Sequence, residues 1–332
     1  MVLEVRGLNV RIPTRQGVLH PVRGIDLSVA AGETLCVVGE SGCGKSLTSL
    51  AVMGLLPPLA RRSADVLRLD GQDLAASTER RMSDLRGDTL AMVFQEPMTS
   101  LNPAYTVGEQ LGEVLRRHRG ATRAAARERA AEMLDCVGIA DPGRRLTQYP
   151  HELSGGLRQR VMIAMALMCE PRLLIADEPT TALDVTIQAQ ILDLLVSLQR
   201  RFGMAIMLIT HDFGVVARVA HRVAVMYAGQ VVETGTVRDV LAAPMHPYSR
   251  GLLDCIPVPG GANRGQVLPT IGGLVPTVME NAQGCGFRNR CAFAQARCAD
   301  GLVPLNAFEG GRAVRCILQE SAEASARALE TA

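Results

Sequence analysis

The stretch TLCVVGESGCGKS, residues 34–46, decides the fold of this chain. It opens with an apolar run, residues 34–38, of the kind that forms a strand buried on both faces of a parallel sheet. A glycine-rich loop of the pattern Gly-x-x-x-x-Gly-Lys-Ser follows, and a helical run then continues until Pro57 and Pro58 stop it. Because the loop has a strand before it and a helix after it, the stretch predicts a phosphate-binding loop rather than a chance glycine-rich turn.

Each residue type in this loop suits a bound nucleotide. Glycines let backbone N–H groups converge on phosphate oxygens, and the following helix directs the positive end of its dipole at the same anion. Lys45 is placed to reach the β- and γ-phosphates, and the Ser46 hydroxyl is placed to ligate Mg²⁺. The residues predicted to bind ATP here are Gly39, Glu40, Ser41, Gly42, Cys43, Gly44, Lys45, Ser46 and Leu47.

A second apolar strand, residues 173–176, ends in two acids. Asp177 is predicted to stand beside the Mg²⁺ ion, and Glu178 to orient or polarise the attacking water. Acids at a strand end are also found where they are simply solvated, but the phosphate-binding loop upstream favours the catalytic interpretation. A third apolar strand, residues 205–210, is followed by His211.

Strands that alternate with helices predict an α/β fold with a mixed, largely parallel sheet. Residues 3–10 and 25–29 have strand-like apolar spacing and add N-terminal antiparallel strands. Residues of about 88–170 are predicted to form a helical subdomain. Beyond residue 245 proline, glycine and cysteine become frequent, which predicts an ATPase domain over 1–245 and a small Cys-rich extension over 246–332.

Composition excludes several classes of partner. The chain carries 35 basic and 33 acidic residues, a net charge of +2, and only 3% aromatic residues with no tryptophan. A nucleic-acid-binding domain is usually strongly basic, so no nucleic-acid partner is expected. No apolar run approaches the ~20 residues of a membrane span, and no signal peptide is evident at the N-terminus. We therefore expect a cytoplasmic chain that touches a membrane through partners.

The string LSGGLRQR, residues 153–160, resembles the signature motif of the ATP-binding cassette (ABC) transporter ATPases. A serine and two glycines before a helix can hold a γ-phosphate, although such a serine also serves as an ordinary N-cap. The resemblance implies that this motif completes the ATP site of an opposite subunit in a head-to-tail dimer. The residues so assigned are Ser154, Gly155 and Gly156.

Other marks of the same family occur in order along the chain. Gln95 resembles the Q-loop glutamine, which contacts the metal and the water and senses the membrane partner; residues 182–184 resemble the D-loop and add Asp184 to the nucleotide site. His211 resembles the switch histidine that contacts the γ-phosphate. The resemblance thus implies a catalytic set, Glu178, His211 and Gln95, and a Mg²⁺ set, Ser46, Gln95 and Asp177. The adenine-stacking aromatic that is common in the family has no counterpart in residues 10–14.

Four further strings narrow the resemblance to the oligopeptide and dipeptide permease ATPases: residues 96–103, 149–152, 179–186 and 245–248. This implies an ATPase motor of a peptide importer on the cytoplasmic face of the inner membrane. Its partners would be a second ATPase subunit (itself or a paralogue), two transmembrane permease subunits and an extracytoplasmic peptide-binding protein. Two alternatives remain open: the same motor for nickel or another small solute, and a soluble ABC ATPase not coupled to transport.

Nine cysteines, an odd number, argue against a disulfide framework in a chain without a secretion signal. Four of them, separated by 5, 6 and 17 residues, gather near the C-terminus. Four thiolates can bind Zn²⁺ or a [4Fe–4S] cluster, and these gaps are wider than structural zinc prefers. Intervening arginines would suit the negative charge of a cluster, which the family resemblance also implies; zinc and free or disulfide-linked cysteines stay open. The predicted ligands are Cys285, Cys291, Cys298 and Cys316.

Overall fold

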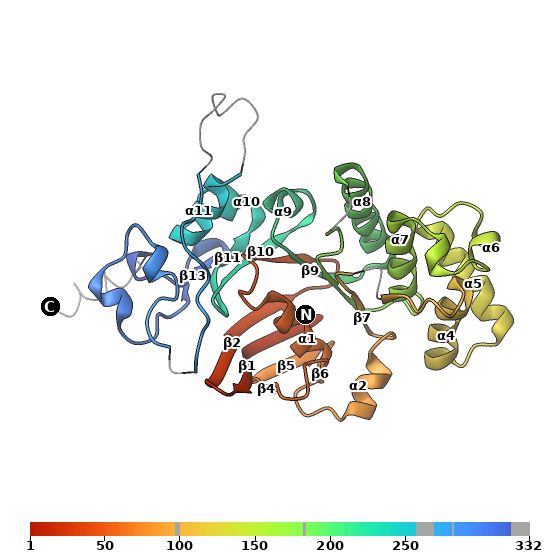
Figure 1. Cartoon of the computed structure of the whole chain (residues 1–332), viewed down its shortest axis with the longest axis horizontal. Helices are drawn as coiled ribbons and strands as arrows, with labels where there is room; N and C mark the ends of the chain where they lie inside the picture. The colour runs from red at the N-terminus through yellow and green to blue at the C-terminus, as the bar shows by residue number, and fades with distance from the viewer. Residues whose placement is uncertain (97–99, 182–183, 257–268, 281, 320–332) are drawn as a thin grey trace.

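The computed structural model describes the chain except residues 97–99, 182–183, 257–268, 281 and 320–332. The first two gaps fall in the string after Gln95 and in the D-loop, so the predictions for those residues lie outside the described part. Figure 1 shows the strands in the middle of the molecule, the helices α4 to α7 at one end and the C-terminal region at the other.

The N-terminal strands form an antiparallel sheet in the order β2-β1-β5-β6, with β4 paired to β1. Apolar side chains of β1 and β2 are buried at alternating positions, interrupted by register shifts between the two strands. The prediction of N-terminal antiparallel strands is therefore confirmed. The bounds are β1 (Leu3–Thr14), β2 (Gly17–Val29), β4 (Arg61–Ser63), β5 (Val66–Leu69) and β6 (Gln72–Asp73).

A second sheet has the order β12-β13-β11-β10-β3-β9-β8-β7, and its pairings from β10 through to β7 are parallel. The strand β3 is buried along its whole length at the centre of this sheet. In parallel sheets ligands bind at the carboxyl ends of the strands, so the carboxyl end of β3 is the expected side for a ligand. The bounds are β3 (Thr34–Val38), β7 (Leu90–Val93), β8 (Leu173–Asp177), β9 (Ala205–Thr210), β10 (Arg222–Tyr227), β11 (Gln230–Thr236), β12 (Asn306–Ala307) and β13 (Ala313–Val314).

The helices α4, α5 and α7 pack together beyond β7 and form the helical part of the molecule. The helix α4 starts with a capping box between Thr106 and Glu109 and ends at Gly120, whose φ is 63°. The strand β7 is one element that the sequence prediction of a helical stretch missed. The bounds are α1 (Lys45–Met53), α2 (Glu79–Leu85), α4 (Val107–Arg119), α5 (Arg123–Cys136), α6 (Pro142–Arg145), α7 (Gly155–Ala166), α8 (Val185–Phe202), α9 (Phe213–Val219), α10 (Val237–Ala242) and α11 (Pro247–Asp254).

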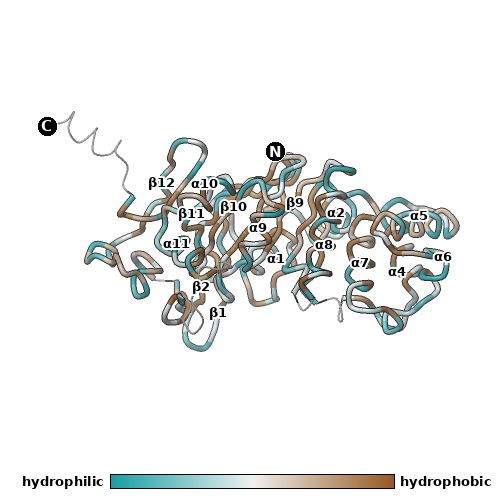
Figure 2. The backbone as a smooth tube through the Cα atoms, turned by 90° about the horizontal axis from the view of Figure 1, so that it is seen from above, coloured by the Kyte–Doolittle hydropathy of each residue, from teal (hydrophilic) through white to brown (hydrophobic). Residues whose placement is uncertain are grey.

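Two apolar cores lie on opposite faces of the second sheet. Alternate residues of β3 enter different cores: Cys36 and Val38 belong to one, Leu35 and Val37 to the other. Figure 2 shows that hydrophobic residues follow the central strands and that hydrophilic residues lie in the outer loops. A central strand covered on both faces is held rigidly, so the loop that leaves it starts from a fixed point.

The C-terminal region, residues 246–319, continues the sheet and the core of the preceding chain. The strand β13 pairs with β11, and Tyr248 and Phe287 belong to the core that contains Cys36. The Glu233 carboxylate of β11 is fully buried and accepts hydrogen bonds from the N–H groups of Met245 and His246 and from Arg312. The composition changes near residue 245, while the sheet and core extend across it.

Candidate nucleotide site

The predicted phosphate-binding loop leaves β3 and turns into α1. All three of its glycines have positive φ values, 154° at Gly39, 79° at Gly42 and 106° at Gly44. A side chain at Gly39 would collide with the carbonyl oxygen of Met226, and one at Gly44 with that of Pro21. The loop conformation therefore requires glycine at both positions, for space as well as for backbone geometry.

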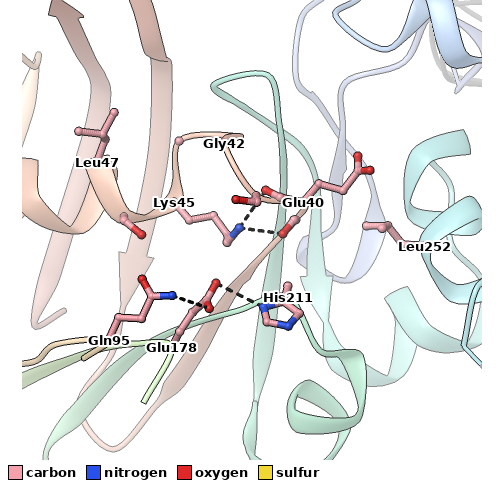
Figure 3. A pocket seen from close by; sticks show the side chains of 12 residues that line it. Glu40, Gly42, Lys45, Leu47, Gln95, Glu178, His211 and Leu252 are labelled. Atoms are coloured by element: carbon pink, nitrogen blue, oxygen red, sulfur yellow. Dashed lines mark hydrogen bonds and ion pairs between the residues drawn. The ribbon is translucent and has the colours of Figure 1, made fainter. Parts of the chain in front are cut away.

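Lys45 is folded onto its own loop. Its Nζ donates to the carbonyl oxygens of Gly39 at 2.7 Å and Glu40 at 3.0 Å, and the residue is 5% exposed. Figure 3 shows the Lys45 amine between these two acceptors, facing the same space as Gln95 and Glu178. A third contact goes to Cys43 Sγ at 3.8 Å. A lysine held by uncharged acceptors can exchange them for the stronger charged acceptors of a phosphate.

Ser46 and Asp177 meet at the foot of the loop, where the Ser46 hydroxyl donates to Asp177 Oδ1 at 3.1 Å. Burial raises the pKa of the Asp177 carboxyl; nearby Glu178 also raises it, while Ser46 and Lys45 oppose the shift. A hydroxyl and a buried carboxylate without a full countercharge are oxygen donors of the type that Mg²⁺ selects. These residues fit the predicted metal contact.

The Glu178 carboxylate lies within polar contact of three other side chains. Its Oε2 accepts from Gln95 Nε2 at 3.1 Å and from the Thr181 hydroxyl at 2.9 Å, and its Oε1 lies 3.3 Å from His211 Nδ1. Gln95, Glu178 and His211 follow the neighbouring parallel strands β7, β8 and β9, so their carboxyl ends bring the three together. Figure 3 shows the side chains pointing toward one another opposite Lys45.

The loop and this cluster share one cavity of about 640 Å³. Sequence reasoning missed Leu252, which reaches the cavity from α11, and Thr181, which holds Glu178. Neither has a local signal, because the first lies far along the chain and the second is an ordinary threonine. The lining residues are Gly39, Glu40, Ser41, Gly42, Gly44, Lys45, Ser46, Leu47, Gln95, Glu178, His211 and Leu252.

The remaining predicted nucleotide residues do not line this cavity. The Cys43 side chain is buried beneath the loop. Ser154 is the N-cap of α7, where its hydroxyl accepts from Leu157 N–H, and Asp184 is the N-cap of α8, where its carboxylate accepts from Ile187 N–H. Gly155 and Gly156 begin α7. Within one chain, therefore, the signature motif and the phosphate-binding loop are not brought together.

Glu40 has two partners in the C-terminal region that the sequence did not predict. Its N–H donates to Tyr248 Oη at 2.9 Å, and its carboxylate accepts from Arg290 Nη1 at 2.7 Å and Nη2 at 2.9 Å. Arg290, one of the arginines that lie between the clustered cysteines, is thus paired with a carboxylate of the phosphate-binding loop. A contact across 250 residues leaves no local pattern in the sequence.

The four clustered cysteines line one small cavity together with His246 and Phe287. Burial is the main cause that raises the pKa values of Cys285, Cys291 and Cys316, which favours their neutral thiol forms. Among the residues that the structure describes, no three His, Cys, Asp or Glu side chains are grouped closely enough to hold a metal ion. The structure thus gathers the predicted ligands around one space without supporting the predicted cluster.

Comparison with known proteins gives consistent matches. Residues 22–181 match the family described as ABC transporter, and residues 232–298 match the oligopeptide/dipeptide transporter C-terminal region. A peptide import ATP-binding protein of Brucella melitensis is 51% identical over 95% of this chain and 96% of its own. The dipeptide transport ATP-binding protein DppD of Bacillus subtilis is 49% identical over 96% of this chain and 95% of its own.

Solved structures agree with these matches. A dimeric ATP-binding cassette in a post-hydrolysis state, bound to ADP and phosphate, superimposes with a TM-score of 0.64 and 28% identity, covering 71% of this chain and 99% of that one. The fold and the site thus define an ABC transporter ATPase. The chain belongs, more narrowly, to the ATP-binding proteins of oligopeptide and dipeptide ABC importers. Its described helices include none long and apolar enough to cross a membrane.

Proposed function

We propose that this chain hydrolyses ATP to drive uptake of dipeptides or oligopeptides through two transmembrane permease subunits. An extracytoplasmic peptide-binding protein would deliver the substrate, and the chain would act at the cytoplasmic face of the inner membrane. The observation that carries the proposal is the convergence of Lys45, Gln95, Glu178 and His211, from separate segments, on one cavity beside the glycine-rich loop. The names of the relatives, peptide import and dipeptide transport proteins, supply the solute class.

In the proposed reaction the loop N–H groups and Lys45 bind the phosphates of ATP, with Lys45 leaving its two carbonyl acceptors. Ser46, Asp177 and Gln95 would hold Mg²⁺, which neutralises charge on the transferred phosphoryl group. Glu178 would orient and polarise the attacking water, and Gln95 and Thr181 fix its carboxylate. His211, which lies beside Glu178 Oε1, would contact the γ-phosphate.

The complete ATP site is proposed to need two subunits. Ser154 is the N-cap of α7, and Gly155 and Gly156 are its first residues; Ser154 and Gly155 are exposed. Asp184 is the N-cap of α8. An exposed helix N-terminus suits an anion that a partner presents. The related cassette that was solved with ADP and phosphate is a dimer. Ser154 to Gly156 and Asp184 would accordingly act on the nucleotide held by the phosphate-binding loop of a second subunit, identical or paralogous.

A metal centre at Cys285, Cys291, Cys298 and Cys316 is also proposed, as a [4Fe–4S] cluster with Zn²⁺ as the alternative. Its support is that all four cysteines line one cavity. Binding would require deprotonation of thiols whose pKa values burial raises, which a metal ion readily causes. Iron, acid-labile sulfide and zinc are measured on protein purified without oxygen. One zinc per chain without sulfide would show a zinc site in place of the cluster. Finding neither iron nor zinc would contradict the proposed metal centre.

The importer function is tested by deleting the gene and measuring uptake of labelled dipeptides and oligopeptides. Uptake should fall and return with the wild-type chain but not with Lys45→Ala, which cannot hold the phosphates. Nickel uptake is measured in the same cells. If the deletion abolishes nickel uptake and leaves peptide uptake normal, the peptide assignment is contradicted. If both uptakes stay normal, a role in import is contradicted.

A further inference from the structure

The C-terminal region holds the phosphate-binding loop at Glu40 by both its backbone and its side chain. Tyr248 in the first turn of α11 accepts from the Glu40 N–H, and Arg290 forms two parallel hydrogen bonds with its carboxylate. Arg290 is followed directly by Cys291. The segment that carries two of the clustered cysteines, residues 285–291, is therefore joined to the nucleotide site by a charged side-chain pair.

Arg290 is fixed on several sides. Its side chain is only 5% exposed, its Nε donates to Gly272 O at 2.8 Å, and its Nη2 donates to Ile271 O at 3.1 Å. The guanidinium also lies over the rings of Tyr227 and Phe287, 5.7 Å and 6.0 Å from their centroids. A planar guanidinium restrained in this way is preorganised for a carboxylate, unlike the flexible partners of an exposed surface pair.

The Glu40 carboxylate has a consequence for any polyphosphate in this cavity. Glu40 lines the cavity, and an unpaired carboxylate there would repel the phosphates of ATP. Arg290 neutralises that charge. Figure 3 shows the Glu40 side chain turned away from Lys45. The Glu40 carboxylate therefore does not pair with the lysine amine, which stays available to bind the phosphates. When Lys45 leaves the Glu40 carbonyl for a phosphate, the bond that Glu40 N–H donates to Tyr248 and the bonds that Arg290 donates to the Glu40 carboxylate still hold this end of the loop.

We propose that Arg290 is a positioning residue for ATP: it neutralises Glu40 and holds the phosphate-binding loop in its receptive shape. The cysteine-bearing segment thereby sets the affinity of the loop for ATP. This inference rests on the proposed ATP binding and does not require that a metal be present. Arg290 touches the loop and not the reacting atoms, so its loss should alter ATP binding far more than the rate of the bound complex.

The test uses the purified full chain and three variants: Arg290→Met, Glu40→Gln and the double variant E40Q/R290M. Equilibrium titration with ATP and Mg²⁺ gives Kd, and steady-state hydrolysis gives KM and kcat. R290M leaves Glu40 unpaired and should raise Kd and KM by about tenfold or more, with kcat at saturating ATP within about twofold. E40Q alone removes the carboxylate that Arg290 pairs with, and its Kd is the reference for the double variant. E40Q/R290M should regain most of the lost affinity, because no carboxylate is left to repel the phosphates.

That rescue separates the proposal from a purely structural role, since E40Q cannot repair the lost bonds to residues 271 and 272. Arg288→Met is the matched control; its guanidinium donates to Gln283 O, and its Kd should equal that of wild type. Unchanged Kd in R290M, or a double variant no better than R290M, overturns the inference. If R290M does not fold, Arg290→Gln and E40Q/R290Q carry the same comparison, because glutamine is also uncharged and keeps a polar side chain. A wild-type chain that binds no ATP would instead refute the proposed function.

Discussion

The two ends of this chain are held together in different ways. Residues 1–245 contain strands of up to 13 residues and two large apolar cores. In residues 269–319 the strands have two residues each and the helices are single 3-10 turns. Two ion pairs, Arg312 with Glu233 and Arg290 with Glu40, join that region to the cassette, and each has one buried member, Glu233 and Arg290. The cassette is stabilised mainly by hydrophobic burial, whereas the C-terminal region depends on pairing with the cassette.

This difference separates the residues proposed to hydrolyse ATP from the contacts that hold the phosphate-binding loop. The side chains proposed to be catalytic stand at the ends of rigid, buried parallel strands, so their mutual geometry does not depend on the C-terminal region. The phosphate-binding loop belongs to the cassette, but at Glu40 it is held by Tyr248 and Arg290 of the C-terminal region. Changes in the first group should affect turnover, and changes in the second should affect ATP affinity or local stability.

The largest expected effect is in the cassette, at Glu178. Glu178→Gln keeps the shape of the side chain and its bond from Gln95 but removes the charge that polarises water, so turnover should fall by roughly 10²–10⁴-fold. Phosphate release measures turnover, and size-exclusion chromatography with ATP should show an accumulated dimer. The thermal midpoint serves as the control and should stay near that of wild type. Near-normal turnover would contradict the assigned role of Glu178.

The next effect tests the anchoring of the C-terminal region. Arg312→Met leaves the fully buried Glu233 carboxylate with only backbone donors, and it should cost about 3 kcal/mol in the stability of that region. Hydrogen exchange should accelerate in β13 and leave β9 protected. Arg218→Met is the matched control, because its pair with Asp193 is largely exposed and is worth less than about 1 kcal/mol. Equal acceleration in β9 would show that both regions unfold as one unit.

A smaller effect is expected in the helical part of the cassette. The Thr106 hydroxyl accepts from Glu109 N–H at the start of α4, so Thr106→Ala should reduce the free energy of unfolding by about 1 kcal/mol. Urea denaturation measures the loss. Thr106→Ser keeps the hydroxyl and should stay close to wild type. A Ser variant as unstable as the Ala variant would indicate that the methyl group of Thr106, and not its cap, matters.

The smallest expected effect lies at the contact between the two regions, where the backbone N–H of His20 in β2 donates to Val278 O. Burial lowers the pKa of the His20 ring; Arg11 and Arg23 lower it further, against Glu280. The unfolded chain therefore takes up a proton near pH 6.5 that the folded chain resists, so stability is lost as the pH falls below about 6.5. Urea midpoints at pH 7.5 and 5.5 measure this loss, and His20→Gln should reduce it. An identical loss in H20Q would assign it to other groups.

Much of the fold was predictable because its signals are local. Buried strands are short apolar runs, so β3, β8 and β9 were predicted, and the motif spacing placed Lys45, Glu178 and His211 correctly at the ends of strands or in the loop. The strand β7 was missed because it lies inside a stretch otherwise rich in helix formers. For the four cysteines the sequence indicated a shared location, but their spacing did not decide whether they bind a metal, or which one.

The sequence by itself determined the class of the protein, because a phosphate-binding loop, a signature string and the strand ends that carry acids are encoded by neighbouring residues. Tertiary structure alone decided how the loop is held at Glu40. Arg290 and Tyr248 reach it from 250 and 208 residues away, and only closure of the chain through the shared core and sheet brings those side chains into contact. It also decided that Ser154 and Asp184 stand apart from the phosphate-binding loop of their own chain, because α7 and α8 place them outside its cavity.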